Sequence, residues 1–145
     1  MMFKFLKDRR GYVMPLNIML IALVAMPMLI LSSEIVRAMY VNVHIQTAVD
    51  AACTAAVQAV DVPHFVATGE LIIDSGIAAS YAQREFDATV ARSNIENYSP
   101  ALTGLSIISN TIAECHASAQ IIWTLPGIAP LTMSVMSAAE AEARR

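Results

Sequence analysis

The sequence predicts an α+β fold: a long N-terminal helix, with a transmembrane half and an extracytoplasmic half, then a second helix and a small antiparallel sheet of about three strands. Three observations predict it. An apolar run long enough to cross a membrane lies near the start, helical periodicity follows it, and alternation with a period of two fills the last third. Only 14% of the 145 residues are charged, against about 25% in ordinary soluble domains, so much of this chain needs an apolar environment.

The apolar run, residues 12–33, is predicted to be a transmembrane helix. Between Tyr12 and Leu31 the only strongly polar side chain is Asn17. A helix rises about 1.5 Å per residue, so this run spans about 30 Å, the thickness of a bilayer's hydrocarbon core. A cleaved secretory signal has a shorter apolar core of about 7–15 residues and a small-residue cleavage site, so we expect this helix to be retained.

Basic residues predict how the helix is oriented. The predicted cytoplasmic segment, residues 1–11, carries four of them: Lys4, Lys7, Arg9 and Arg10. Because positive charge is enriched on the cytoplasmic side, residues 34–145 are expected outside the cytoplasm as an α+β domain. That domain is mildly acidic and has no basic stripe, so nucleic acid is not expected as a partner.

The helix is expected to continue beyond the membrane, because residues 35–60 contain no Gly or Pro. Apolar side chains at spacings of three and four form one stripe there: Ile45, Val49, Ala52, Cys53, Ala56 and Val60. Pro63 is expected to end this helix, since proline disfavours helical geometry at the residue before it. Residues 61–74 then form a connection with room for one short helical turn.

The second helix is expected from Ile77 to about Asn97. Asp74 offers an N-cap before it, and residues 98–100, which include a proline, are expected to stop it. Apolar side chains recur at four-residue spacing along it: Ala78, Ala82, Phe86 and Val90.

Alternation predicts three consecutive strands in an antiparallel meander. The first is expected to begin near Leu105, and the third runs from Leu131 and fades through residues 139–142. The clearest strand covers residues 115–125 and alternates polar side chains with apolar ones: Cys115, Ala117, Ala119, Ile121, Trp123 and Leu125. The apolar face needs a cover, which the two helices can supply.

The two cysteines, Cys53 and Cys115, are both expected to point into the core. Two states are consistent with the sequence: a disulfide, which would add about 4 kcal/mol by closing a long loop, or two buried free thiols. Sequence alone does not give the separation that decides between them.

No other residues form a recognisable site for chemistry. His44, His64 and His116 do not have the spacing of a metal site. The chain has no serine in a nucleophile-elbow pattern and no glycine-rich phosphate loop. We therefore expect no metal, no cofactor and no enzymatic activity.

The order of these features resembles the TadE/TadG-like proteins of tight-adherence (Tad/Flp) pilus systems. The resemblance rests on Arg9-Arg10-Gly11, on the apolar span around Pro27, and on the alanine-rich helix of residues 46–56. It implies a pilin-like minor pilin or pilus-assembly component in the bacterial inner membrane, with a periplasmic or extracellular domain that can join a surface filament. Where a glutamate often follows a processed glycine by five residues, this chain has Leu16, so both cleavage at Gly11 and an uncut anchor stay open.

The resemblance also implies how the chain acts. Its N-terminal helix would pack against membrane lipid and against other pilus or envelope membrane proteins, in a homo- or hetero-oligomer. The residues expected to pack and anchor are Leu16, Asn17, Leu20, Leu23, Pro27 and Leu31. The alternative is an accessory single-pass scaffold subunit of a larger bacterial membrane complex, which copurifying proteins would distinguish.

Overall fold

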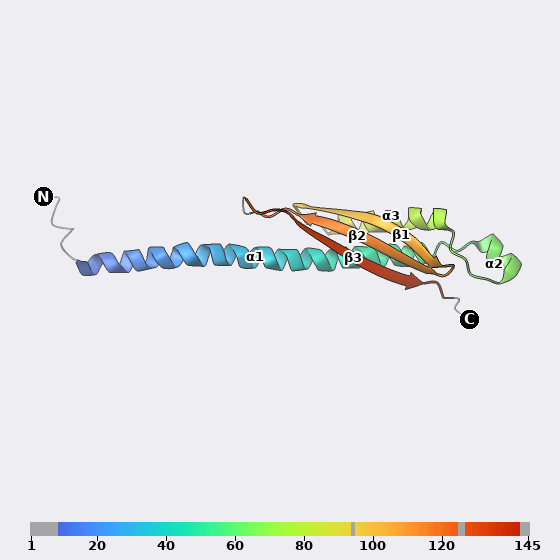
Figure 1. The fold of residues 1–145 in the computed structure, drawn as a ribbon, viewed down its shortest axis with the longest axis horizontal. Coiled ribbons are helices and arrows are strands. Elements are labelled where there is room, and N and C mark those ends of the chain that lie inside the picture. Colours follow the sequence, from blue (N-terminus) through green and yellow to red (C-terminus); the bar gives the residue numbers. More distant parts are fainter. Residues whose placement is uncertain (1–8, 94, 125–126, 143–145) are drawn as a thin grey trace. The chain divides into compact units, whose positions relative to one another are not determined.

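The computed structural model describes the backbone of residues 9–93, 95–124 and 127–142, and the side chains of these ranges from Pro15 onward (Figure 1). The predicted α+β class is confirmed, since a long N-terminal helix and further helices accompany a three-stranded antiparallel sheet. Its elements are α1 (Arg9–Val57), α2 (Val62–Thr68), α3 (Ser75–Arg92), β1 (Tyr98–Ser109), β2 (Ile112–Ile121) and β3 (Leu131–Glu140). The chain divides into two compact units, Met1–Arg37 and Ala38–Arg145.

The helix α1 runs without interruption through Pro15 and Pro27 and supplies residues to both units. It ends at Val57, three residues before the predicted end. Its last turn tightens, because the next two backbone N–H groups donate to carbonyls three residues back, at 3.2 Å each. Val60, expected on the helical stripe, instead pairs with Ile73 in an isolated antiparallel bridge.

The connection after α1 contains a seven-residue helix, α2, where the sequence predicted at most one turn. Asp61 caps it by accepting a hydrogen bond from the His64 backbone N–H at 3.1 Å. Gly69 ends it with a φ of 76°, a left-handed conformation that glycine adopts without strain. The return to α3 is tied to the sheet, since the Ile73 N–H donates to the Asn110 carbonyl between β1 and β2 at 2.9 Å.

The predicted N-cap of α3 is confirmed. The Asp74 carboxylate accepts hydrogen bonds from the backbone N–H groups of Gly76 at 2.9 Å and Ile77 at 3.2 Å. The helix begins at Ser75, two residues earlier than predicted, and it ends at Arg92 instead of near Asn97.

The start of β1 corrects the sequence prediction. Residues 98–100 do not stop a helix; they open a strand, which begins at Tyr98 instead of near Leu105. Proline fits there because β1 lies at one edge of the sheet, where a missing N–H needs no partner strand. The β1–β2 register shifts twice, between Leu102 and Gly104 and again between Ile107 and Ser109.

The strands β2 and β3 pair without interruption from Ile112 opposite Glu140 to Ile121 opposite Leu131. The clearest predicted strand was placed three residues too late, since β2 begins at Ile112 and its buried alternation begins at Ala113. Trp123 follows the strand, and Leu125 lies outside the described residues.

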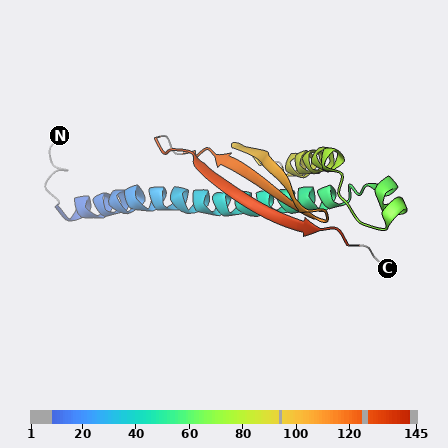
Figure 2. The same ribbon diagram turned by 45° about the vertical axis from the view of Figure 1, so that its right-hand side comes forward.

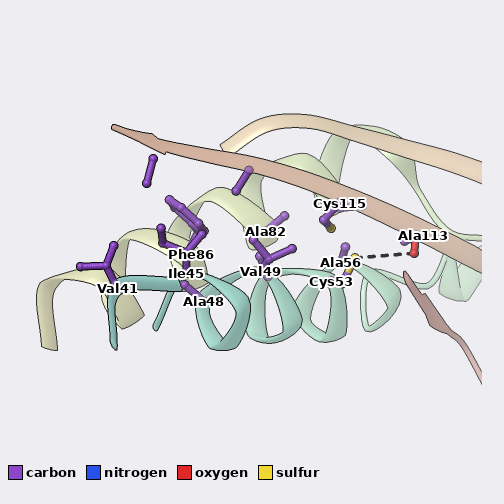
Figure 3. Packing of buried hydrophobic residues seen from close by; sticks show 14 of the residues in the cluster. Val41, Ile45, Ala48, Val49, Cys53, Ala56, Ala82, Phe86, Ala113 and Cys115 are labelled. Atoms are coloured by element: carbon purple, nitrogen blue, oxygen red, sulfur yellow. Dashed lines mark hydrogen bonds between the residues drawn. The ribbon is translucent and has the colours of Figure 1, made fainter. Parts of the chain in front are cut away.

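The core of the second unit lies between the sheet and two helices. Figure 2 shows the second half of α1 and the helix α3 beside the sheet, and the buried side chains come from all three. Figure 3 shows Ile45 and Val49 of α1 among Ala82 and Phe86 of α3. The predicted covering of the apolar sheet face by both helices is therefore confirmed, and the many alanines let the backbones approach closely.

Candidate functional site: the apolar surface of the N-terminal helix

The first unit exposes large apolar side chains on every side of α1. We call residues 16–31 the apolar surface. Twelve large hydrophobic side chains there are exposed: Leu16, Ile18, Met19, Leu20, Ile21, Leu23, Val24, Met26, Met28, Leu29, Ile30 and Leu31. Among the described residues, α1 is the helix that is long and apolar enough to cross a membrane, which makes it a candidate membrane span.

The six predicted packing residues all lie on this surface and are all exposed. The exposed fraction is 56% for Leu16, 61% for Leu20 and 72% for Leu23. With Pro27 and Leu31 they are spaced by four, three, four and four residues, which places them on one face of the helix. Asn17, which is also exposed, follows Leu16 and is the one residue of the apolar surface with an amide side chain.

Two serines just C-terminal to the apolar surface use their hydroxyl groups in hydrogen bonds within the helix. Ser32 donates to the Met28 carbonyl at 2.8 Å, and Ser33 donates to the Ile30 carbonyl at 2.7 Å. Such internal bonds let a hydroxyl lie in an apolar environment without a water partner. Charged side chains begin just beyond, where Arg37 lies 3.6 Å from the Glu34 carboxylate.

The predicted basic cluster falls at the limit of the described residues. Lys4 and Lys7 lie outside them, while Arg9 and Arg10 begin α1 and their side chains are not described. The orientation that these four residues predict, with a cytoplasmic N-terminus, stays a prediction.

Sequence reasoning missed an exposed apolar patch on the part of α1 that belongs to the second unit. Met39, Tyr40 and Val43 are 65%, 55% and 64% exposed. The Tyr40 ring stands edge-on to His44 at 5.0 Å, and its hydroxyl lies 3.2 Å from the imidazole Nε2. The spacing of three and four residues that separates Val43 from Tyr40 and Met39 is the signal in the sequence that could have indicated this patch.

The two cysteines meet in the core of the second unit. Both are fully buried, and the Cys53 thiol donates to the Ser137 carbonyl at 3.2 Å and to the Ala113 carbonyl at 3.6 Å (Figure 3). Ser137 pairs directly with Cys115 across the β2–β3 ladder, so Cys53 of α1 lies against Cys115 of β2. The side-chain hydrogen bond to Cys53, together with burial, raises the pKa of Cys115. Both are thiols in this structure, and the disulfide stays a prediction.

Other polar groups of the described residues are the remaining places to look for a chemical site. Within the described ranges, no group of three or more His, Cys, Asp or Glu side chains is placed to hold a metal ion. His116 lies 3.0 Å from Glu114 on the outer face of β2. A hollow of about 400 Å³ between α1 and α3 is lined by Ala51, Thr54, Ala55, Gln58 and Glu85. The Thr54 hydroxyl donates to the backbone carbonyl of Asp50 in its own helix at 2.8 Å.

Comparison with protein-family models, with curated proteins and with solved structures finds no match to this chain. Its function is therefore inferred from the chemistry of its own surfaces.

Proposed function

We propose that this chain is a membrane-anchored envelope protein, a TadE/TadG-like minor pilin or pilus-assembly component that works by helix packing and assembly. The observation that carries the proposal is the apolar surface of α1, on which Leu16, Leu20 and Leu23 are each more than half exposed. So large and continuous an apolar surface needs lipid or a partner to cover it. The chemistry that this proposal requires is packing between apolar surfaces.

The proposed mechanism uses the similarity of two apolar environments. Lipid tails and the side chains of neighbouring apolar helices solvate α1 about equally well, so the helix can leave the bilayer for a bundle of helices at little cost. The face that contains Leu20 and Leu23 would make the packing contacts. Asn17 would hydrogen-bond across the bundle, a contact worth about 0.6–2 kcal/mol in membranes, and this would fix the register of neighbouring helices.

Location follows from the same proposal. The helix stands in the bacterial inner membrane with the basic cluster on the cytoplasmic side, and the unit from Ala38 onward lies in the periplasm or on the cell surface. Protease added to the outside of spheroplasts is expected to digest that unit and to leave a membrane-protected N-terminal fragment. A tail that only a protease inside the cell can cut would contradict this orientation.

Photo-crosslinking in living cells tests the packing itself. A benzoylphenylalanine at Leu23 is expected to capture filament or secretion proteins in the membrane. The same group at Ile77, an exposed apolar position of α3, is the matched control and should not capture them. Capture at Leu23 of one fixed set of enzyme subunits would identify an accessory scaffold subunit instead. If Leu23 captures no protein and the intact chain stays soluble without detergent, the proposal is wrong.

A further inference from the structure

The two edges of the sheet differ in how well they are protected against another strand. The strand order is β1-β2-β3, so β1 and β3 each have one free side among the described residues. The free edge of β1 carries Pro100, the register of β1 with β2 shifts twice, and α3 contacts this strand. Proline and irregular register are common devices that keep an edge strand from pairing further.

The free edge of β3 has neither a proline nor a register shift, and the contact it receives from a helix side chain is a single hydrogen bond from Gln46 of α1 to the Met136 carbonyl. All ten residues from Leu131 to Glu140 pair with β2 in one unbroken register. The strand has no proline, and its only charged residue is Glu140 at the end. Leu131 is 36% exposed and Met136 is 59% exposed. Alternate residues of such a strand direct their N–H and C=O groups to the free side, which makes a regular template for one more strand.

Two acidic residues, Asp50 and Glu140, lie near this edge. The Gln46 amide on α1 reaches the Met136 carbonyl of β3 at 3.5 Å and donates to the Asp50 carboxylate at 3.0 Å, so Asp50 lies one side chain away from the middle of the strand. Glu140 stands at its end. No Lys or Arg occurs between Arg92 and Arg144, so the chain's own strands bring no positive charge to this edge.

We propose that the free edge of β3 binds an extended segment of a partner protein as a fourth strand, and that a Lys or Arg of this segment pairs with Asp50. The backbone ladder would supply the binding, and the charge would select the segment and its register. Apolar side chains on the face of the added strand that points toward α1 would pack against this helix beside those of β3. This proposal stands on the second unit alone and is independent of the membrane anchor.

A second copy of this chain is a poorer occupant. Two β3 strands that pair antiparallel, with matching faces and Met136 at the centre, would bring the Asp50 carboxylates of both copies toward each other. Like charges brought together in this way cost free energy, whereas a basic partner segment gains it.

Hydrogen–deuterium exchange of the full chain in lipid nanodiscs tests the proposal. The probes are two synthetic peptides, acetyl-Thr-Val-Thr-Lys-Thr-Val-Thr-amide and its twin with Glu in place of Lys. We expect the lysine peptide to slow exchange in β3 by about tenfold and to leave β1 unchanged. The glutamate twin should bind up to about fivefold more weakly, as the loss of one exposed ion pair predicts.

Two matched variants isolate the charge. Asp50→Asn should remove the difference between the peptides. Asp87→Asn should keep it, since Asp87 accepts a hydrogen bond from Gln83 at 2.9 Å in the same four-residue spacing, but on α3. Equal slowing in β1 and β3, or no slowing in either, would overturn the proposal. Slowing in β3 that grows with protein concentration and needs no peptide would assign the edge to a second copy and would also overturn it.

Discussion

Oxidation of the cysteine pair gives the sharpest test of where the second unit resides. Cys53 and Cys115 are buried together, and outside the cytoplasm we expect them to form a disulfide. The two thiols would pass two electrons and two protons to the disulfide of an oxidising thiol–disulfide exchange protein, which is itself reduced to a dithiol. In the cytoplasm the same pair would stay reduced.

The size of the effect follows from the loop that the bond closes. Cys53 and Cys115 enclose about 60 residues, and the chain-entropy estimate for such a loop is about 4 kcal/mol at 25 °C. For a unit of this size, that difference corresponds to about 15 °C in Tm. Reduction leaves the packed core of the folded state unchanged, but it increases the conformational entropy of the unfolded chain. The Tm of the second unit should therefore fall strongly.

The assay is mass spectrometry of the full chain, extracted in detergent, unfolded, and then alkylated without reductant so that buried free thiols also react. We expect no alkylated cysteine before reduction and two after reduction and unfolding. A double variant, Cys53→Ala with Cys115→Ala, is the control, since its Tm should not respond to reductant. Two alkylated cysteines in the unreduced chain, or an unchanged Tm when reductant is added, would refute the disulfide and leave two buried thiols.

Three further substitutions test the core, the span and a cap. Phe86→Ala should lower the free energy of unfolding by about 3–5 kcal/mol, because it leaves a cavity in the buried core. The control Phe65→Ala, at a position 39% exposed, should lower it by about 1 kcal/mol or less. Similar losses for both variants in urea titrations would contradict the described core. Leu23→Arg should raise the free energy of membrane insertion by about 3 kcal/mol, so that alkaline carbonate extracts more of the chain from membranes. The control Thr47→Arg should leave the extracted fraction unchanged, and equal extraction of both variants would argue against the span. Asp74→Ala should cost about 1 kcal/mol by removing two capping bonds, and an unchanged urea midpoint would show that these bonds contribute nothing.

Local chemistry was readable from the sequence wherever neighbouring residues decide it. The cap at Asp74 and the alternation through Ala117 and Ala119 depend on side chains within a few positions, and both were predicted. Pro100 is an example of a residue whose structural role its sequence neighbours do not decide. A proline is equally compatible with a helix stop and with an edge strand, and the position of a strand within its sheet is a tertiary fact.

The candidate site divides in the same way. Composition revealed the apolar surface, because the run of apolar side chains in residues 16–31 can be read directly from the sequence. The burial of Cys53 and Cys115 was readable from periodicity, but their contact depends on how α1 packs against β2. The exposed Met39 and Tyr40 were missed because their exposure depends on which face of α1 the rest of the second unit covers.

On the proposed membrane anchor, Ser32 and Ser33 have a consequence for how deeply the helix can enter the bilayer. Because Ser32 and Ser33 bond to carbonyls of their own turn, neither one resists being drawn into hydrocarbon, and the first groups that do resist are Glu34 and Arg37. The helix can therefore slide by about one turn along the bilayer normal at low cost. We expect the same chain to tolerate bilayers of different thickness, and so to keep its outer part at the surface as the lipids around it change.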